Sequence, residues 1–297
     1  MKQLFHAVEY QRRDGVAIVT MSNPPVNGLS HALRLGLVDA FTHAIGDPYV
    51  NAVVLTGGAK GFSAGGDIRE LGSPLAGAAP ALSLHVHPVI ERCPKPTVAA
   101  LHGIAMGGGL ETALVCHYRL AAADTRVALP EIKLGLIPLS GTQRLPRVLG
   151  LERAIDFILD SKTLLARDFA GDTLFDEVID AEPSVIVERA VEYAAAAVRD
   201  RRQQIAVRDR PIITRGEARE VVARGRIRAA EIGPAATAAI EAIAASLDSA
   251  DFDAGMRRAR EIYDALSASD EVRRQRDRFL APRSSAGAHS PSTEPQR

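Results

Sequence analysis

The sequence lacks the features that mark membrane and nucleic-acid-binding proteins. No apolar run reaches about 18 residues, which argues against a membrane span. The 297 residues contain 36 Lys plus Arg and 36 Asp plus Glu, so net charge provides no general attraction to nucleic acid or an anionic membrane. The N-terminus has no apolar segment or cleavage site of the secretory type. We therefore expect a cytoplasmic protein that binds neither nucleic acid nor membrane.

Cysteine and histidine are too few or too scattered to indicate a metal centre. Cys93 and Cys116 are the two cysteines of the chain, and we expect them to be free, buried thiols. The eight histidines are scattered and form no convincing ligand cluster. We expect no metal ion and no disulfide framework.

Apolar patterns predict an α/β core. Apolar residues at helical spacing predict helices over residues 32–46 and 81–92, the second ended by Pro94. Short apolar runs predict strands at residues 16–22, 52–57, 97–105, 118–123, 126–130 and 173–180. Strands that alternate with helices at this spacing are typical of an α/β fold.

Beyond about residue 184 the strand signals end and the chain becomes rich in Ala, Arg and Glu. Helical periodicity marks residues 185–198, 234–247 and 254–266. The last residues are rich in Pro and Ser, a composition typical of disorder. We therefore predict three parts: a core over 1–185, an all-helical region over 186–281 that covers the site or mediates oligomerisation, and a disordered tail over 282–297.

One serine lies in a pattern that suggests a hydrolase. Residues 61–65, GFSAG, match the G-x-S-x-G pattern of a nucleophile elbow. An elbow joins strand to helix directly and is followed in the chain by an acid and a histidine, but residues 57–61 separate Ser63 from its strand. The single histidine after His117 is His289, in the predicted tail. We interpret Ser63 as a loop residue.

A second glycine run, Gly107 to Gly109, does not match the dinucleotide fingerprint, because Thr112 stands where a third Gly or Ala is required. Both glycine-rich segments nevertheless lie between a predicted strand and a predicted helix. Such junctions point backbone N–H groups forward, and glycine lets a ligand approach the chain closely. Two junctions side by side could hold one oxygen between two donors, as an oxyanion hole does. Two ordinary turns are the alternative.

Two glutamates accompany these junctions. Glu111 lies in the first turn of the helix after the glycine run, and Glu131 follows the short strand at 126–130. Each position alone is typical of a carboxylate that pairs with a helix N-terminus. Together, near a pair of N–H donors, the two carboxylates are candidates for acid and base catalysis.

Three segments in this order resemble the crotonase superfamily, in particular the enoyl-CoA hydratases. They are GFSAGGDIREL (61–71), ALHGIAMGGGLETALVCHYRLA (100–121) and VALPEIKLGLIPLSGTQRLPRVLG (127–150), and the similarity runs from about residue 5 to 185. The segment SASDEVRRQRDRFLAPR looks more like the hydratase/isomerase part of bifunctional peroxisomal-type β-oxidation proteins. Those proteins continue into a dehydrogenase with a dinucleotide fingerprint, which we do not expect here.

The resemblance implies a fold of stacked ββα turns, a crotonase-like spiral, with a C-terminal helical region. It places the N–H groups of Gly66 and Gly108 in an oxyanion hole, and Glu111 and Glu131 at the positions of the two catalytic glutamates. The backbone of three residues would line the site for the adenine end of coenzyme A: Ala64, Asp67 and Ile68.

The resemblance also implies the partners of the protein. The substrate would be an acyl-CoA thioester, so coenzyme A would enter as part of the substrate and no separate cofactor is expected. Relatives form homotrimers or hexamers that are dimers of trimers. The bifunctional relatives fold their extra helices over their own core, which would permit a monomer.

Two glutamates favour hydration of a trans-2-enoyl-CoA to a 3-hydroxyacyl-CoA, since many relatives with other chemistry keep one of the two. The loop from Pro138 to Gln143 departs from the hydratase pattern, because it is one residue shorter and poorer in glycine. A Δ3,Δ2-enoyl-CoA isomerase, which would need Glu131 alone, or an enzyme of other CoA-thioester enolate chemistry therefore stays an alternative. A non-catalytic acyl-CoA-binding protein is a second one.

Overall fold

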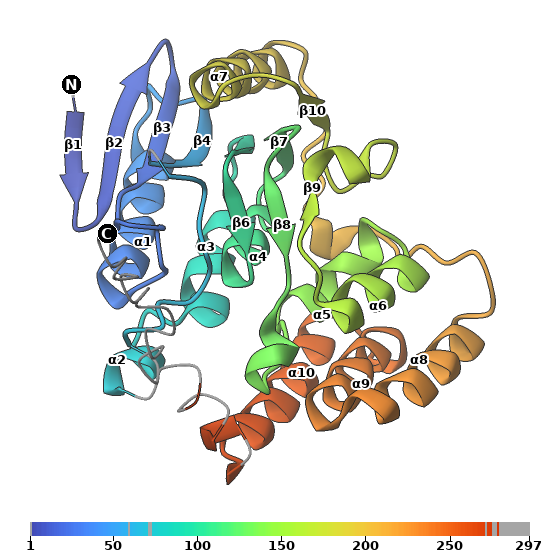
Figure 1. The fold of residues 1–297 in the computed structure, drawn as a ribbon. Coiled ribbons are helices and arrows are strands. Elements are labelled where there is room, and N and C mark those ends of the chain that lie inside the picture. The colour runs from blue at the N-terminus through green and yellow to red at the C-terminus, as the bar shows by residue number, and fades with distance from the viewer. Residues whose placement is uncertain (1, 59, 71–72, 271, 275–277, 279–297) are drawn as a thin grey trace, which may run out of the picture.

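A computed structural model describes residues 2–58, 60–70, 73–270, 272–274 and 278 of the chain. These residues form a seven-stranded sheet in the order β1–β2–β3–β4–β5–β7–β10 and a smaller sheet in the order β6–β8–β9 (Figure 1). The strands of the large sheet are β1 (Lys2–Phe5), β2 (Val8–Arg13), β3 (Val16–Met21), β4 (Ala52–Gly57), β5 (Thr97–Leu101), β7 (Tyr118–Ala122) and β10 (Glu177–Ile179).

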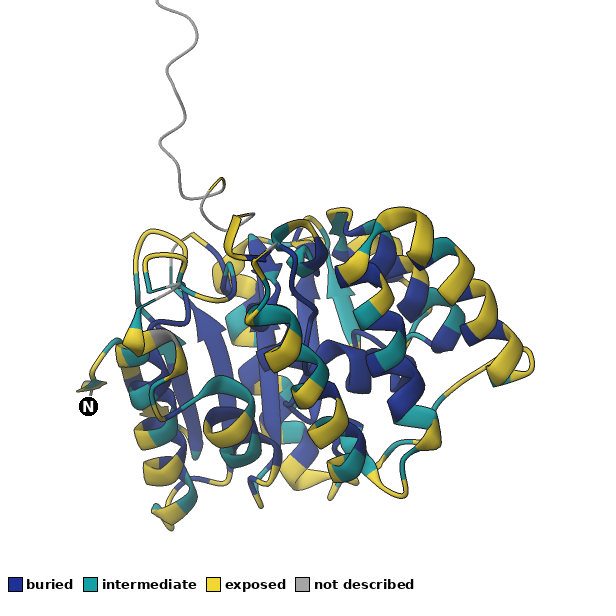
Figure 2. Ribbon diagram, turned by 90° about the horizontal axis from the view of Figure 1, so that it is seen from below, coloured by how far each residue is buried: buried dark blue, intermediate teal, exposed yellow. Residues whose placement is uncertain are grey.

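The large sheet is antiparallel from β1 to β3 and parallel from β3 to β10. The small sheet pairs β6 (Ile104–Met106) in parallel with β8 (Arg126–Ala128), and β9 (Leu164–Leu165) runs antiparallel to β8. The parallel strands read as nearly continuous apolar runs because helices cover both faces of the sheet (Figure 2).

Two apolar layers lie on the two faces of the large sheet. In β3, Ala17 and Val19 belong to the main core with helix α1 (His31–Gly46), whereas Val16 and Ile18 face the opposite layer. The helix α7 (Pro183–Arg199) closes that opposite layer. The alternation follows directly from the two-residue period of a strand.

The helices α8 (Ala218–Ile232), α9 (Pro234–Asp248) and α10 (Phe252–Ser267) form a group at the opposite end of the molecule from α7 (Figure 1). This group packs on α5 (Gly141–Arg144) and α6 (Leu151–Asp160) of the same chain. Gln143 Nε2 donates to Ala242 O at 2.6 Å, which ties α5 to α9. The C-terminal helices therefore cover their own core.

The remaining helical elements are short and lie in the connections. They are α2 (Pro74–Gly77), the π-helix η1 (Leu82–Val86), α3 (His87–Glu91), α4 (Gly108–Leu114), and the 3-10 helices η2 (Glu131–Leu134), η3 (Leu145–Arg147), η4 (Ala166–Phe169) and η5 (Val207–Asp209).

The strand predicted over 97–105 is wrong as one unit, because it is two strands in different sheets. The chain turns between β5 and β6 at Gly103, which has φ +63°, so β6 leaves the large sheet and joins β8. The run predicted at 173–180 contributes only β10, and the helix predicted at 81–92 consists of η1 followed by α3. The strands β1 and β2 and the helix α8 were not predicted, since their apolar patterns are short or interrupted by charge.

Helix α7 packs on the sheet, and the predicted boundary at residue 185 falls inside it. The three-part division of the chain stays a prediction, and the predicted tail over 282–297 lies outside the described residues. Among the residues that the structure describes, none of the helices combines the length and the apolar character that crossing a bilayer requires.

The packing of α1 against the N-terminal hairpin predicts that substitution of two of its glycines will change stability by different amounts. A Cβ on Gly36 would lie 2.3 Å from Phe5 O, whereas a Cβ on Gly46 would meet no atom within 4 Å. We expect Gly36→Ala to lower the free energy of unfolding by about 1–3 kcal/mol through overpacking. Gly46→Ala should change it by less than about 1 kcal/mol. Urea unfolding measures both, and equal effects would contradict the close packing of α1.

Candidate active site

The glycine-rich loop after β4 runs alongside β6. Phe62 N donates to His102 O at 2.9 Å, Ser63 N donates to Ile104 O at 3.0 Å, and Met106 N donates to Ser63 O at 2.9 Å. Ser63 and Ala105 thereby form a parallel bridge. These bonds bring the end of the first glycine segment next to the start of the second.

Ser63 holds this loop through its side chain. The buried hydroxyl donates to Asn27 O at 2.7 Å and accepts from Gly65 N at 3.1 Å. Its proton and an oxygen lone pair are therefore committed to the backbone. This arrangement agrees with our interpretation of Ser63 as a loop residue.

The amides of Gly66 and Gly108 border the same small space. A Cβ on Gly108 would lie 3.8 Å from Gly66 N, and a Cβ on Gly65 would lie 3.2 Å from Gly108 N. Gly108 is the first residue of α4, so no helical carbonyl is in a position to accept from its N–H. Leu82 Cδ2 and Leu29 Cδ1 form apolar walls, at 2.9 and 3.2 Å from the same Cβ position on Gly108.

Glycine is required at position 107 for two reasons. Its φ of +52° lies in the left-handed region, and a Cβ there would stand 2.7 Å from Glu131 Oε1. The carboxyl group of Glu131 therefore packs directly against the chain, one residue before the Gly108 amide.

Glu111 reaches the site from the first turn of α4. Its backbone N donates to Gly107 O at 3.0 Å, and its buried side chain accepts from Gly141 N at 2.7 Å through Oε1. Gly141 begins α5 and lies within the Pro138–Gln143 loop that departs from the hydratase pattern. The shorter loop thus supplies an amide donor to this carboxylate.

Glu131 has a different environment. It begins η2 immediately after Leu129 and Pro130, and its Oε2 atom is buried without a hydrogen-bond partner among the described residues. A buried carboxylate oxygen without a partner favours the neutral, protonated acid.

The two carboxyl groups are close enough to influence each other. Burial raises the pKa of Glu131 well above its ordinary value, and the charge of Glu111 raises this pKa further. Burial also raises the pKa of Glu111, but the N–H groups of Gly141 and Ser140 and two arginines, Arg144 and Arg260, oppose the rise. The surroundings therefore favour the neutral form at both glutamates, and more strongly at Glu131 than at Glu111.

Helix α10 contributes two side chains that our sequence reasoning did not identify. Arg260 donates through Nη2 to Ser83 Oγ of η1, and its charge lowers the pKa of Glu111. Burial raises the pKa of Tyr263, and the charges of Glu111 and Glu131 contribute to the rise. The helical period predicted α10 but gives no information about which distant segment its face would contact.

The three residues predicted to line the coenzyme A site lie beside Gly66. Ala64 N donates to Val26 O at 2.9 Å, and the Asp67 carboxylate pairs with Arg69 Nη2 at 2.6 Å. Ile68 is 46% exposed. They adjoin Gly66 in the chain, and their role in binding coenzyme A stays a prediction.

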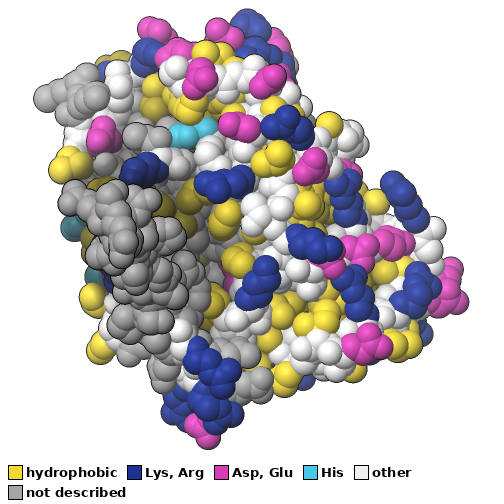
Figure 3. Space-filling model, in the orientation of Figure 1, with side chains coloured by type: hydrophobic (Ala, Val, Ile, Leu, Met, Phe, Trp, Pro, Cys, Tyr) yellow, Lys and Arg dark blue, Asp and Glu magenta, His cyan; other side chains and the backbone are white. Residues whose placement is uncertain are grey.

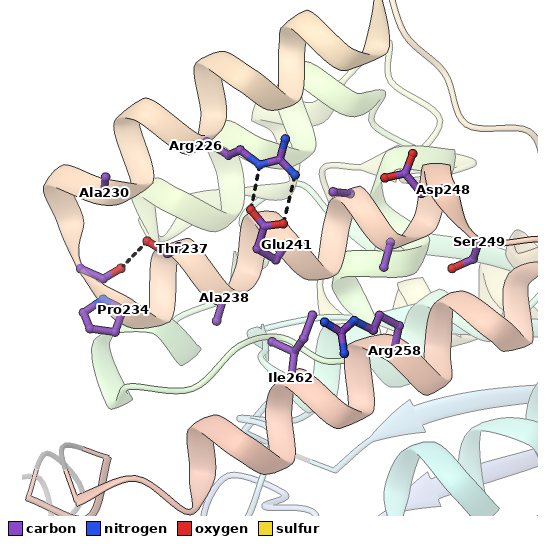
Figure 4. A pocket seen from close by; sticks show the side chains of 13 residues that line it. Arg226, Ala230, Pro234, Thr237, Ala238, Glu241, Asp248, Ser249, Arg258 and Ile262 are labelled. Atoms are coloured by element: carbon purple, nitrogen blue, oxygen red, sulfur yellow. Dashed lines mark hydrogen bonds and ion pairs between the residues drawn. The ribbon is translucent and has the colours of Figure 1, made fainter.

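A separate pocket of about 810 Å³ lies between α8, α9 and α10 and contains none of the predicted site residues (Figure 4). Arg226 in this pocket pairs with Glu241 at 2.8 Å. The surrounding surface mixes Lys and Arg with Asp and Glu (Figure 3). Arg226 and Glu241 are thus paired with each other in this pocket, which contains neither of the two candidate glutamates.

Neither cysteine belongs to the candidate site. Cys93 and Cys116 are buried, as predicted. Within the described part of the chain, no three His, Cys, Asp or Glu side chains form a group that could hold a metal ion.

The sequence profile of the enoyl-CoA hydratase/isomerase family matches residues 11–212, and the chain belongs to this family. It is 42% identical over 184 residues to a peroxisomal bifunctional enzyme of Danio rerio, covering 62% of this chain and 25% of that protein. It is 32% identical over 290 residues to the peroxisomal bifunctional enzyme of Homo sapiens, covering 96% and 39%. The chain thus spans well under half of the length of these relatives.

Solved structures share the fold. An enoyl-CoA hydratase/isomerase from Pseudoalteromonas atlantica T6c superposes with a TM-score of 0.68 at 23% identity, over 92% of this chain and 96% of its own. A carnitinyl-CoA dehydratase from Mycobacterium avium 104 gives a TM-score of 0.63 at 25% identity, over 90% and 94%. The predicted crotonase-like fold with C-terminal helices is confirmed.

The structural role of Ser63 is testable by removal of its hydroxyl. Ser63→Ala would leave Asn27 O and Gly65 N buried without their partner. We expect the free energy of unfolding to fall by about 1–3 kcal/mol, as measured in urea. A fluorophosphonate that labels nucleophilic serines should not react with wild type at Ser63. Covalent labelling of Ser63 would show that it is a nucleophile and would contradict its assignment as a loop residue.

The environment of Glu131 predicts a pH-dependent effect on stability. Folding raises the pKa of Glu131, so the folded protein keeps its full stability below the pKa of this group in the unfolded chain. Stability is lost as pH rises through the folded pKa, because the group must then ionise in a buried environment. Glu131→Gln removes this loss, so the variant should gain stability relative to wild type as pH rises above about 4.5.

Urea unfolding between pH 4 and 8 measures the difference, with Glu9→Gln on the exposed surface of β2 as the control. A difference between Glu131→Gln and wild type that is independent of pH would show that Glu131 is ionised at no cost in the folded protein.

Proposed function

We propose that this chain hydrates trans-2-enoyl-CoA thioesters to 3-hydroxyacyl-CoA. The observation that carries the proposal is a pair of glutamates, Glu111 buried and Glu131 partly buried, in different environments near the amides of Gly66 and Gly108. Glu111 accepts a backbone N–H, whereas Glu131 Oε2 has no partner among the residues described. Pairs of acidic groups with diverging pKa values are typical of acid and base catalysis.

The thioester oxygen would lie between the N–H groups of Gly66 and Gly108. As the nucleophile adds at C3, negative charge accumulates on this oxygen and the thioester becomes an enolate. Preorganised amides stabilise that charge, and loss of one such donor typically raises a barrier by about 2.7–4 kcal/mol. The apolar walls of Leu29 and Leu82 would exclude water from this space and strengthen both hydrogen bonds.

The two glutamates would divide the proton transfers. Ionised Glu111 would take a proton from water as the water oxygen bonds to C3 and the C2–C3 π electrons move toward the carbonyl. Neutral Glu131 would then give its proton to C2 as the enolate collapses. Action of both groups on one face of the double bond would give syn addition. Transfer of a proton from Glu111 to Glu131, directly or through solvent, restores the starting state.

The coenzyme A part of the substrate would lie along Ala64, Asp67 and Ile68, with no separate cofactor. The packing of α9 on α5 covers the core within one chain, so a monomer is compatible with a complete site, and a trimer or hexamer stays a prediction. The cytoplasmic location likewise stays a prediction. The relatives are peroxisomal or glyoxysomal by name.

A Δ3,Δ2-enoyl-CoA isomerase is the second candidate. The observation that favours it is the packing of Glu131 against Gly107, beside the amide pair, where one carboxyl group could move a proton between C2 and C4. This reaction needs no water and no second glutamate. A non-catalytic acyl-CoA-binding protein would use the amide pair but neither carboxyl group.

The two enzymatic functions differ in their response to single substitutions. Hydration of crotonyl-CoA should fall by about 10²–10⁴-fold in both Glu111→Gln and Glu131→Gln, because each removes one proton transfer. Isomerisation of a 3-enoyl-CoA should fall in Glu131→Gln and persist in Glu111→Gln. Ultraviolet absorbance of the conjugated thioester follows both reactions.

Retention of hydratase activity by Glu131→Gln would refute its assigned role. Binding of the thioester by wild type without turnover of either substrate would favour the non-catalytic alternative. Glu9→Gln on β2 is the matched control, since it removes an exposed carboxylate far along the chain from both glutamates.

A further inference from the structure

A buried ion pair lies behind the candidate site. Arg144 of α5 donates to Glu91 of α3 through two parallel bonds, from Nε to Oε1 at 2.9 Å and from Nη2 to Oε2 at 2.6 Å. The Arg144 and Glu91 side chains are 3% and 1% exposed. A buried ion pair is weak evidence for stability, because desolvation offsets most of its attraction. The position of this ion pair behind the candidate site therefore suggests a role other than stabilising the fold.

The third contact of Arg144 leads toward Glu111. Its Nη1 atom donates to Ser140 Oγ at 2.6 Å. Ser140 directly precedes Gly141, whose N–H donates to Glu111 Oε1 at 2.7 Å. The guanidinium group thus fixes the same turn that orients the Glu111 carboxylate.

Arg144 also contacts the helix that covers the site. Its guanidinium carbon lies 4.8 Å from the centre of the Phe252 ring at the start of α10, and its Nη1 lies 3.9 Å from Met256 Sδ. Helix α10 carries Arg260 and Tyr263 toward the two glutamates. One arginine therefore connects the Ser140 turn, α3 and α10.

We propose that Arg144, oriented by Glu91, is a positioning residue for Glu111, because it fixes the Ser140–Gly141 turn and the start of α10 around that carboxylate. Arginine suits this role since its planar fork makes three directed hydrogen bonds at once, which lysine cannot reproduce. The proposal deepens the function proposed above and rests on Glu111 as the base.

The charged groups that face Glu111 come from three elements. Glu131 approaches from η2, Arg144 from α5, and Arg260 and Tyr263 from α10. The Arg144 cation and the neighbouring N–H groups oppose the rise in the pKa of Glu111 that burial causes. Loss of the cation, and of the turn that it holds, should therefore raise the pKa of Glu111 further.

A matched arginine separates positioning from general packing. Arg147 also stacks on Phe252, with its guanidinium carbon 5.2 Å from the ring centre, and donates to Gln143 O at 2.7 Å. It makes none of the described contacts with Ser140 or Glu91 that Arg144 makes. Arg147→Met therefore removes a cation from the same cluster and leaves the Ser140–Gly141 turn in place.

The experiment compares Arg144→Met, Arg144→Lys and Arg147→Met with wild type in kcat, KM and the pH profile of kcat/KM for crotonyl-CoA. We expect Arg144→Met to lower kcat about 10- to 100-fold, as misplacement of a reacting group does, and to move the acidic limb of the profile to higher pH. Arg144→Lys should lower kcat and keep the limb closer to the wild-type position. Arg147→Met should leave the limb at the wild-type pH.

Removal of one partner from a buried pair leaves an uncompensated charge, so Arg144→Met can fail to fold. The double variant Glu91→Leu, Arg144→Met replaces both partners with apolar groups. Arg208, which lies 3.9 Å from Glu91 Oε2, keeps its pair with Asp253 at 2.8 Å. The double variant should fold and show the same shift of the acidic limb. A double variant with wild-type kcat and pH profile would overturn the proposal and leave the pair as a structural clamp.

A titration that needs no turnover separates this proposal from the proposed function. Carbon-13 NMR of side-chain-labelled glutamate follows the Glu111 carboxyl group directly, with Glu111→Gln to assign its signal. The signal should titrate at higher pH in the double variant than in wild type, whether or not wild type hydrates crotonyl-CoA. An unchanged titration would overturn the positioning role, whereas an inactive wild type with a shifted titration would overturn only the hydratase assignment.

Discussion

The pairing of the loop after β4 with β6 is the constraint on which the candidate site depends. Backbone hydrogen bonds from Phe62 and Ser63 to the His102–Ile104 segment fix the two glycine junctions side by side. The proposed two-donor site needs both junctions, because one would supply the amide of Gly66 and the other the amide of Gly108. The Ser63 hydroxyl, which suggests a nucleophile in the sequence, instead strengthens this pairing through Asn27 and Gly65.

The electrostatics of the site follow from the elements that bring each glutamate in. Glu111 comes from a helix start and meets the amide of another helix start, together with cations from α5 and α10. Glu131 comes from a short 3-10 turn and packs against Gly107, where one of its oxygens has no partner in the described part of the chain. Two identical side chains thereby differ in how strongly they hold a proton, with Glu131 holding it more strongly. Such groups destabilise the fold locally, which is expected where buried acids serve chemistry.

Much of the core was predictable because its signals are local. Continuous apolar runs marked β3 and β4, and helical spacing marked α1 and α10. The division of residues 97–105 was missed because a single glycine, Gly103, turns the chain from one sheet to another without interrupting the apolar pattern. The strands β1 and β2 were missed because their exposed positions carry charge, as at Glu9 and Arg12.

The site residues that lie within the sequence motifs could be proposed from the sequence. They are Glu111, Glu131, Gly66 and Gly108. The contributions of Arg260 and Tyr263 could not, because the face that α10 presents to the core depends on packing between segments more than 100 residues apart. The pairing of Glu91 with Arg144, which joins α3 to α5 across 53 residues of sequence, was not predictable either. These residues are far apart in the sequence, so their contacts around Glu111 can be identified only from the folded structure.

The most direct test concerns the thioester carbonyl itself. Infrared difference spectroscopy of a saturated acyl-CoA, labelled with carbon-13 at the carbonyl and bound to the protein, reports how strongly that oxygen is hydrogen-bonded. Convergent N–H groups of Gly66 and Gly108 should move the carbonyl stretch to lower frequency than in water, because two fixed donors in an apolar space polarise the bond more than solvent does. A bound carbonyl with the frequency of the free thioester would contradict the two-amide site.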